Sequence, residues 1–595
     1  MNTRAYEFPN PLGVLAGRPF APEAWLRAAG DPGLVVLAWE LARIPKDLDG
    51  PTRRRLHLLL SLLLAAQAQG SSRLALAGPP LEALHRAFGE APVDWAAFLE
   101  DPRLQILVGG PEAGRPLVRI GNTLASRRLV AAETHIGARI RERLAQPPRE
   151  LAPPDEVLAA PVPLNPEQRA AVAAAVRGPL VLVTGGPGTG KTSILSAILR
   201  ALLASGLDPE AIALAAPTGK AAQRMGESVG GVSEALPEPR TLHRLLGWDP
   251  RLGRFRHGAA HPLRLKVLLV DEASMIGLEL MDALLDALPV GARLVLLGDA
   301  DQLPSVEAGT VFRDLVAGLP DAVARLTRSH RLDAADPGGR AILEAAQALG
   351  AGRDPALTPA AGLDEMEAPG IRLWPSDDAD LRTFLRRWRG RRPTEAPVLS
   401  LREGVLDPTS LERLDVLAAG WNAARLLCLL REGEGLRCTD GVNTFLHGEA
   451  LKAVGPRRAP APFLPGEPVL ARRNDYARGL FNGDQGLVAL VSRDGAPPRP
   501  EVVFLRPDGP AWFPLEAVQA GLEHAYALTV HKAQGSEYEH VALVLPEQDH
   551  PLLTREILYT ALTRARRSVA VLGDPALLAL GAARPLQREG RLRLN

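Results

Sequence analysis

The middle of the chain alternates short apolar runs with amphipathic segments. PLVLVT at 179–184, VLLVDE within 266–275 and LVLLGD within 292–309 are apolar stretches that end in polar residues, a pattern typical of buried strands. SILSAILRALLA at 193–204 instead repeats its apolar positions every three to four residues, as a helix does. This succession predicts an α/β fold.

Other parts of the chain follow different patterns. Residues 1–150 are rich in Leu and Ala and mostly helical in period, and a Pro-rich charged linker follows at 145–156. Between 466 and 520, short apolar strands alternate with N-D, N-G and D-G turns, which predicts a small β-barrel. Two short segments around a glycine turn in 247–258 predict a β-hairpin.

Composition and charge narrow the class of protein. The 595 residues are 46% hydrophobic and 23% charged, which suits several globular domains. Two cysteines are too few for a disulfide framework. The longest apolar stretch, which starts at Leu56, is too short to span a bilayer, and the first residues lack a signal-peptide pattern. We therefore expect a cytoplasmic protein without membrane contact. With a net charge of +1, any nucleic-acid site must be a local patch.

Lysine is rare in this chain. Of 69 basic residues only six are lysines, namely Lys46, Lys191, Lys220, Lys266, Lys452 and Lys532. A lysine that stands in a motif is therefore expected to do what a guanidinium group cannot.

Residues 185–192 form the pattern G-x-x-x-x-G-K-[ST] between the strand at 179–184 and the helix at 193–204. In that context backbone N–H groups curl around phosphate oxygens, the lysine reaches the β- and γ-phosphates, and the hydroxyl after it serves Mg²⁺. We expect this loop to bind ATP, rather than being a chance glycine-rich turn, through Gly185, Gly186, Pro187, Gly188, Thr189, Gly190, Lys191, Thr192 and Ser193.

Acidic and amide side chains follow the next two strands. Asp271 and Glu272 end the second run, where Asp271 would hold Mg²⁺ and Glu272 would deprotonate the attacking water. A strand end followed by a helix cap is the alternative. Gln302, with Asp299 and Asp301, follows the third run and could sense the γ-phosphate, although Gly-Asp is also an ordinary turn signal.

Seven segments occur in a fixed order: GGPGTGKT, APTGKAAQRM (216–225), TLHRLL (241–246), VDEAS, GDADQLPSVEAG, HAYALTVHKAQGSEY (524–538) and LYTALTRAR (558–566). They resemble the ordered motifs of superfamily 1 helicases, most closely the RecD family, which supplies the α subunit of the RecBCD (exodeoxyribonuclease V) complex. The resemblance covers roughly residues 160–595.

The resemblance implies two RecA-like P-loop motor domains, at 151–322 and at 323–465 with 521–595. It also implies a β-hairpin pin at about 238–262, an SH3-like insert at 466–520, and a mainly helical, partner-binding domain at 1–150.

The resemblance assigns roles to residues of the matching segments. Catalytic roles fall to Lys191, Asp271, Glu272, Gln302, Arg331 and Arg564, the last as an arginine finger. Besides the loop, the nucleotide is contacted by Gln168, which reads adenine, and by Gln534, Gly535 and Glu537, while Thr192 and Asp271 hold Mg²⁺. The DNA-contacting residues are Thr218, Lys220, His243, Trp248, Phe255, Asn474, Thr529, His531 and Lys532, with Tyr476 and Asn482 as further candidates.

Plainer interpretations stay open for several of these residues. Asn165, Pro166 and Gln168 also form a good helix start, and both roles are compatible for Gln168. Lys220 and Arg564 could be solvated side chains on helices. Trp248 and Phe255 could merely hold a surface hairpin together. The basic stretch 381–393, with Phe384 and Trp388, is either a DNA patch or the solvated face of an amphipathic helix.

We therefore expect an ATP- and Mg²⁺-dependent DNA helicase that acts in double-strand break repair. By resemblance it moves 5′-to-3′ and works with RecB-like and RecC-like subunits; a solitary RecD-like helicase, a regulatory P-loop ATPase subunit and a small-molecule kinase are the alternatives. None of the six lysines has a carboxylate two residues before it, and no His/Cys cluster has metal-binding spacing. We expect no nuclease activity in this chain.

Overall fold

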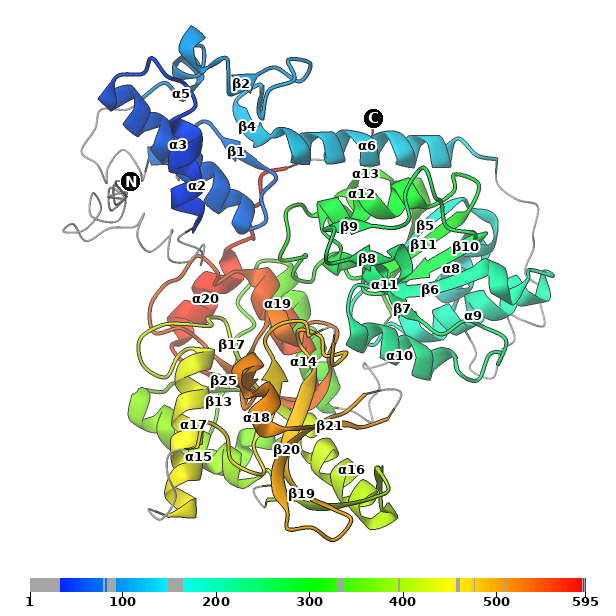
Figure 1. Cartoon of the computed structure of the whole chain (residues 1–595), viewed down its shortest axis with the longest axis vertical. Coiled ribbons are helices and arrows are strands. Elements are labelled where there is room, and N and C mark those ends of the chain that lie inside the picture. Colours follow the sequence, from blue (N-terminus) through cyan, green and yellow to red (C-terminus); the bar gives the residue numbers. More distant parts are fainter. Residues whose placement is uncertain are drawn as a thin grey trace, which may run out of the picture.

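The computed structural model describes residues 33–78, 81–82, 93–147, 164–328, 337–393, 396–455, 461–475, 477–506, 509–590, 592 and 594. Figure 1 shows an N-terminal unit in blue, a first lobe in cyan and green, and a second lobe that begins in green and continues through yellow to red. Across the described ranges, no helix combines the length and the apolar character needed to cross a bilayer.

The N-terminal unit contains helices and, in addition, a small sheet; the sequence patterns predicted the helices but did not reveal the sheet. Its strands lie in the order β1-β4-β3-β2, with bounds Arg73–Ala75 (β1), Val108–Gly109 (β2), Leu117–Ile120 (β3) and Thr123–Ser126 (β4). Its described helices are Gly33–Ala42 (α2), Gly50–Ala68 (α3), Trp95–Phe98 (α5) and Arg127–Leu144 (α6). The unit is therefore mixed, although helices contribute more residues than strands.

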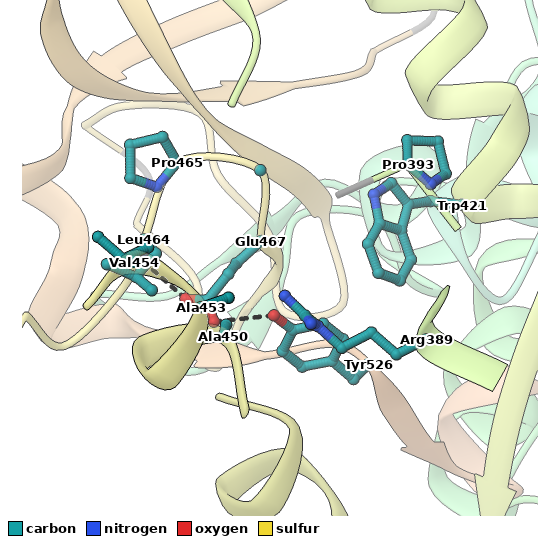
Figure 2. A pocket seen from close by; sticks show the side chains of 11 residues that line it. Arg389, Pro393, Trp421, Ala450, Ala453, Val454, Leu464, Pro465, Glu467 and Tyr526 are labelled. Atoms are coloured by element: carbon teal, nitrogen blue, oxygen red, sulfur yellow. Dashed lines mark hydrogen bonds between the residues drawn. The ribbon is translucent and has the colours of Figure 1, made fainter. Parts of the chain in front are cut away.

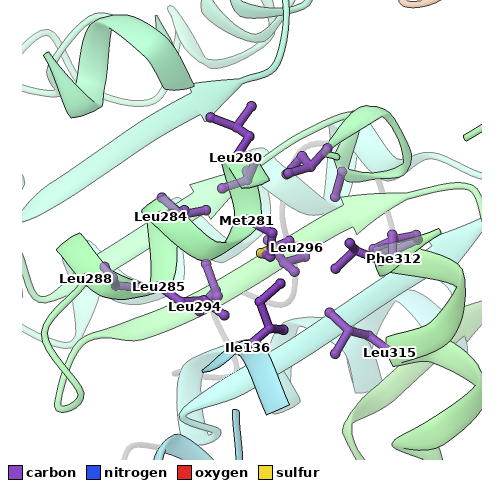
Figure 3. Close-up of a cluster of buried hydrophobic side chains, with 14 of the residues drawn as sticks. Ile136, Leu280, Met281, Leu284, Leu285, Leu288, Leu294, Leu296, Phe312 and Leu315 are labelled. Carbon is purple, nitrogen blue, oxygen red and sulfur yellow. The ribbon is translucent and has the colours of Figure 1, made fainter. Parts of the chain in front are cut away.

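Helix α6 joins the N-terminal unit to the first lobe. Its apolar residues, among them Leu129, Ile136 and Ile140, are buried in one cluster with Met281, Leu284 and neighbours of the first lobe. In Figure 3, Ile136 points into the leucines of that lobe. The N-terminal unit is thus anchored through a shared apolar core.

The first lobe, residues 164–328, is built on a parallel sheet in the order β12-β5-β11-β10-β6-β7. Its strands are Leu180–Gly185 (β5), Ile212–Ala216 (β6), Arg240–Thr241 (β7), Val267–Val270 (β10), Arg293–Gly298 (β11) and Val323–Leu326 (β12). The three runs identified from the sequence are β5, β10 and β11. Because β12 pairs with β5, the first lobe extends past the boundary predicted at residue 322.

Helices cover both faces of this sheet. Alternate residues of β5 and β10 enter opposite cores, so that Leu182 and Leu268 face one side whereas Val183 and Leu269 face the other. The helices are Pro166–Arg177 (α8), Lys191–Ala204 (α9), Gly219–Val229 (α10), Leu242–Leu246 (α11), Leu278–Ala287 (α12) and Val311–Gly318 (α13). Burial on both faces explains why these strands are continuous apolar runs.

The second lobe contains another parallel sheet, in the order β13-β14-β25-β24-β17-β23. Its strands are Thr358–Pro359 (β13), Gly370–Trp374 (β14), Ala424–Cys428 (β17), Ala527–Thr529 (β23), Tyr538–Val544 (β24) and Ala565–Leu572 (β25). Its helices are Pro337–Gly350 (α14), Asp378–Gly390 (α15), Pro408–Ala423 (α16), Thr439–Val454 (α17), Arg555–Thr563 (α19) and Pro575–Ala583 (α20). Two parallel sheets with helices define an α/β fold.

A further, mostly antiparallel sheet lies within the second lobe and is called the insert sheet here. It contains Pro468–Ala471 (β18), Gln485–Arg493 (β19), Arg499–Phe504 (β20) and Ala511–Pro514 (β21), which fall within the predicted insert. It also recruits Val398–Arg402 (β15), Val405–Leu406 (β16) and Leu522–His524 (β22). Strand β15 runs parallel to β19, so the sheet extends beyond the 466–520 segment.

Candidate active site

The glycine-rich loop connects β5 to α9 at the carboxyl edge of the first sheet. Gly190 has φ 83° and is the N-cap of α9, a left-handed conformation that favours glycine. A Cβ atom on Gly185 would lie 2.8 Å from both Leu326 Cβ and Thr189 Oγ1. Neither position accommodates a side chain without rearrangement, so the conformation of the loop requires glycine at both.

Lys191 begins α9, and its ammonium folds over the loop. Its Nζ donates hydrogen bonds to the carbonyls of Gly185 (2.6 Å) and Gly186 (3.1 Å). Thr189 is buried, with its hydroxyl donating to the Gly186 carbonyl at 2.8 Å, whereas Thr192 is exposed. The loop therefore presents an ammonium group, a hydroxyl and the amino end of a helix on one side, which together suit an anion.

Gln168 supports this loop from α8. Asn165 and Gln168 form a reciprocal capping box at the start of α8, as the plainer interpretation of this segment predicted. The Gln168 side chain also donates from Nε2 to the Thr189 carbonyl at 3.0 Å, and the residue is only 2% exposed. The structure thus assigns Gln168 a role in supporting the loop, and its contact with adenine stays a prediction.

Asp271 and Glu272 follow β10, two strands from the loop in the sheet order. Burial raises the pKa of Asp271 to about 6, and the adjacent Glu272 carboxylate adds to the rise while Lys191 opposes it. Asp271 Oδ1 accepts a hydrogen bond from the Glu272 backbone N–H at 2.8 Å. Glu272 has φ 53°, an uncommon left-handed conformation for a residue with a Cβ. Such strain clusters at functional sites.

The end of β11, between β5 and β10, contributes a buried amide and carboxylate. Gln302 donates from Nε2 to Asp299 Oδ2 at 3.0 Å, and both side chains are buried. Burial raises the pKa of the nearby Asp301, and the Asp299 charge adds to that effect. Polar ends of three adjacent parallel strands therefore meet at one edge of the sheet, where open α/β sheets bind their ligands.

Helix α19 of the second lobe packs against this edge. The Tyr559 hydroxyl donates to Asp299 Oδ2 at 3.0 Å, and the Thr560 hydroxyl accepts from the Leu303 N–H at 2.8 Å. Gln534 Nε2 donates to the Leu303 carbonyl at 2.6 Å. The Tyr559 hydroxyl also lies 3.1 Å from where a Cβ on Gly186 would stand. Tyr559 was not identified from the sequence, although it lies within the LYTALTRAR segment.

Arg564 lies at the carboxyl end of α19 and is 4% exposed. Its Nε donates to the Thr560 carbonyl and its Nη1 to the Ser536 carbonyl, each at 3.2 Å. Arg564 is therefore a buried side chain on the helix that contacts the loop, and the alternative of a solvated arginine on a helix is wrong. Arg331, the other cation predicted from the second lobe, lies outside the described residues.

Gly535 and Glu537 make a second bridge between the lobes. Arg224 of α10 donates from Nη1 to the Gly535 carbonyl at 3.0 Å and lies 3.7 Å from the Glu537 carboxylate. Arg566 donates to the same carboxylate from Nε at 2.9 Å. Both residues predicted to contact the nucleotide thus connect the lobes.

Thr218 and Lys220, predicted to contact DNA, lie where α10 meets the second lobe. Thr218 caps α10 by accepting from the Ala221 N–H, and Lys220 Nζ lies 5.5 Å from the Tyr538 ring centroid. Burial lowers the pKa of Lys220, while the nearby Tyr538 opposes that change. Lys220 is therefore not a fully solvated side chain.

The other predicted DNA contacts in the second lobe follow β23. Thr529 Oγ1 accepts from the Lys532 N–H, and the Lys532 ammonium pairs with Glu523. Burial lowers the pKa of His531 to about 4, and the Arg588 charge acts in the same direction. His531 is therefore neutral at pH 7, so that any contact it makes with DNA relies on a hydrogen bond.

The predicted hairpin is present as Trp248–Asp249 (β8) and Arg254–Phe255 (β9). Trp248 and Phe255 are paired across it, with ring centroids 4.9 Å apart, and His243 lies 5.7 Å from Phe255. The hairpin is thus held together by its own aromatics, as the plainer interpretation predicted. The turn carries Leu252, which is 60% exposed, and this apolar tip was not identified from the sequence.

Residues of two other regions that were considered as DNA contacts interact with other residues of the chain. Asn474 Oδ1 accepts from the Asn482 N–H at 2.8 Å, and Tyr476 lies outside the described residues. In the basic stretch 381–393, which forms most of α15, Phe384 and Trp388 are buried. Four of its arginines pair with carboxylates, namely Arg386, Arg387, Arg391 and Arg392. The face of an amphipathic helix is thus the better description of this stretch.

A phosphate-type loop beside an acidic strand end, contacted by a second parallel-sheet lobe, defines a P-loop ATPase with two lobes. Comparison with known proteins is consistent with this class. Residues 163–368 match the family described as "AAA domain", and residues 524–572 match "UvrD-like helicase C-terminal domain".

The similar proteins place the chain in a family. "RecBCD enzyme subunit RecD" of Mycobacterium tuberculosis is 38% identical over 452 residues, which are 72% of each chain. "ATP-dependent RecD2 DNA helicase" of Deinococcus radiodurans is 33% identical over 558 residues, covering 91% of this chain and 68% of that protein. The crystal structure of Pif1 helicase from Candida albicans matches with a TM-score of 0.39 at 19% identity, over 70% of this chain and 96% of that one. The chain belongs to the RecD family of superfamily 1 helicases, and it is an ATP-dependent DNA helicase.

Proposed function

We propose that this chain is a motor that hydrolyses ATP between its two lobes and moves 5′-to-3′ along single-stranded DNA. The observation that carries the proposal is the contact between α19 and the glycine-rich loop. Tyr559, which is more than 350 positions after Lys191 in the chain, approaches Gly186 closely and donates to the buried Asp299. A ligand held at such a junction touches both lobes only when they are together.

Within this site we assign roles from the chemistry of each side chain. Lys191 contacts the β- and γ-phosphates, Glu272 orients and deprotonates the attacking water, and Gln302 senses the γ-phosphate. Arg564, with Arg331, stabilises the charge that develops on the transferring phosphoryl group. Such an arginine contributes roughly 10³–10⁵ in rate.

The site suits a magnesium ion. Asp271 is a buried carboxylate whose pKa is raised by burial, so that a nearby cation would favour its charged form. The Thr192 hydroxyl and Asp271 would hold the ion, which supplies charge neutralisation at the phosphates. Magnesium prefers such oxygen ligands.

Movement along DNA follows if the grip on the strand alternates with closure of the lobes. We assign DNA contacts to Thr218, Lys220, Thr529, His531 and Lys532, near the joints between the lobes. The carbonyl of Gly535 accepts a hydrogen bond from Arg224 of α10. A movement of Gly535 on nucleotide binding or release would therefore displace α10 and Thr218, which caps it.

Two smaller elements are assigned to handling the duplex. We propose that the β8–β9 hairpin separates the strands, with His243, Trp248 and Phe255 stabilising a pin whose tip is Leu252. We propose that residues 466–520, with Asn474, form an SH3-like module over the DNA. Arg244 at the base of the hairpin lies 4.8 Å from the Phe481 ring centroid, which supports joint action of the two elements.

We propose that the chain is the RecD-type subunit of a helicase–nuclease with RecB-like and RecC-like partners, acting in double-strand break repair. Residues 1–150 would contact the partners, and the two motor domains would span 151–322 and 323–465 with 521–595, except that β12 belongs to the sheet of the first. The 38% identity to a RecBCD subunit supports this assignment. A solitary RecD-like helicase stays the alternative, and the D. radiodurans DNA helicase matches over 91% of this chain.

Two assays test the proposal. ATP turnover should rise when single-stranded DNA is added and should be abolished in Lys191→Ala, whereas turnover indifferent to DNA would exclude a motor. Duplexes with a 5′ or a 3′ overhang should show unwinding from the 5′ tail alone.

Purification from the native cell distinguishes the subunit of a complex from a solitary helicase, because a solitary helicase would be recovered without partners. The purified chain should not degrade linear DNA.

A further inference from the structure

Three side chains with metal-binding atoms meet where the insert sheet joins the second lobe. His447 lies on α17, Glu467 directly precedes β18, and His524 ends β22. One ligand atom from each lies within 4.8 Å of the other two. Their sequence separations gave no metal-binding pattern, because each residue lies on a different element and only folding brings them together.

The donor set and its dimensions are compatible with a metal site. His447 Nδ1 lies 2.8 Å from Glu467 Oε1, and His524 Nε2 lies 3.2 Å from Glu467 Oε2. Bonds of about 2.0–2.2 Å in a tetrahedral zinc site separate neighbouring ligand atoms by about 3.4 Å. The carboxylate–imidazole separations are already close to that value, and the two imidazoles need only a small approach.

Further groups orient the Glu467 carboxylate. The Tyr526 hydroxyl donates to Glu467 Oε1 at 2.8 Å, and the Leu464 N–H donates to Oε2 at 2.6 Å. Hydrogen bonds from outer groups to the carboxylate are characteristic of metal ligands in proteins.

A cavity borders the Glu467 side of this cluster. It has a volume of about 250 Å³ and is lined by Glu467, Tyr526, Arg389 and Trp421, among others. Figure 2 shows the Tyr526 hydroxyl hydrogen-bonded to Glu467 beside this cavity, with Arg389 next to the tyrosine. The Glu467 side chain is 3% exposed and each imidazole 16%. A bound ion would therefore be shielded from bulk solvent, and three protein ligands would leave a fourth position for another ligand.

We propose that His447, Glu467 and His524 bind one transition-metal ion, for which zinc is the best match. Two imidazoles and one carboxylate favour zinc and related ions over magnesium or calcium. The ion would connect α17 of the second lobe to both β18 and β22. It would act as a structural link that fixes the insert sheet on the motor, separate from the nucleotide site.

Zinc content tests the proposal directly. The full chain, prepared without a polyhistidine tag, is stripped with a chelator, equilibrated with Zn²⁺ and analysed by mass spectrometry of the metal. We expect about one zinc per chain, and at least tenfold weaker binding in His447→Ala and His524→Ala. His261→Ala is the matched control, because His261 is exposed and remote in the fold, and it should bind as the wild type does.

Two further measurements do not depend on the folding of these variants. Co²⁺ added to the stripped wild-type chain should give the visible absorption of a low-symmetry, four-coordinate ion, and Zn²⁺ should displace it. Zinc should also raise the melting temperature of the wild-type chain, by an amount that declines as the pH falls and protons compete for the ligands. Failure of the wild type to bind zinc, or equal binding by a His447→Ala/His524→Ala double variant, would show that the cluster is only a hydrogen-bonded network.

Discussion

Replacing Tyr559 by Phe would remove one hydroxyl from the contact between the lobes. That hydroxyl donates to Asp299 Oδ2 at 3.0 Å, and the two residues are 6% and 1% exposed. Burial raises the pKa of Tyr559 well above its usual value, and Asp299 adds to the rise, so the tyrosine is a neutral donor at pH 7. The phenyl ring retains the packing of the original side chain among the apolar residues of the second lobe.

The size of the effect follows from the type of hydrogen bond. A hydrogen bond to a charged group contributes about 1.5–3 kcal/mol, which corresponds to roughly 10- to 100-fold in an equilibrium constant. Asp299 Oδ2 still accepts from Gln302 after the substitution, so the lower part of that range is expected. Because the bond joins the two lobes, its loss should disfavour their closed arrangement and lower kcat/KM for ATP by about tenfold.

The assay is steady-state ATP turnover with saturating single-stranded DNA, with the melting temperature measured in parallel. Thr310→Val is a suitable control, because it removes a hydroxyl that donates to the Asp314 carboxylate at 2.9 Å within the first lobe alone. It should lower stability without changing kcat/KM. A double-mutant cycle with Asp299→Asn then isolates the coupling between tyrosine and carboxylate. A change in kcat/KM below twofold for Tyr559→Phe, or zero coupling in the cycle, would refute the inference that this contact controls closure.

Three other outcomes are expected. In the metal-free protein, the raised pKa of Asp271 should make the free energy of unfolding fall as the pH rises from about 4 to about 6. Denaturant titrations should show that this pH dependence disappears in Asp271→Asn. An unchanged pH profile in the variant would contradict the assignment. Gly185→Ala should lower stability by about 1–3 kcal/mol, because its Cβ would meet Leu326 at 2.8 Å, and a melting temperature equal to that of the wild type would show that the loop adapts. Leu252→Asp, at the exposed hairpin tip, should slow unwinding while leaving DNA-stimulated ATP turnover intact, and normal unwinding would exclude the tip as the separating element.

The sequence was most informative where local pattern and chemistry coincide. The runs that became β5, β10 and β11 are buried on both faces, so their apolar character was visible without knowledge of their neighbours. Polar residues at the carboxyl ends of parallel strands meet at one edge of the sheet. For that reason Lys191, Asp271 and Gln302 could be grouped from the sequence alone.

Short strands, and strands that pair with a distant part of the chain, were harder to predict from the sequence. The N-terminal sheet has strands of two to four residues, which leave no clear periodicity. Strand β12 was assigned to the second motor domain, but its pairing with β5 is a long-range contact that the local sequence does not specify. The same holds for β15, which joins the insert sheet from outside the predicted segment.

The sequence by itself determined the family, the α/β class and the chemical groups of the nucleotide loop, because these depend on residue types at fixed local spacing. Only the tertiary structure decided which residue of LYTALTRAR reaches Asp299, that Gln168 supports the glycine-rich loop, and that His447, Glu467 and His524 lie together. Such contacts join residues from separate elements, and their geometry is set by packing between those elements, which local sequence does not encode.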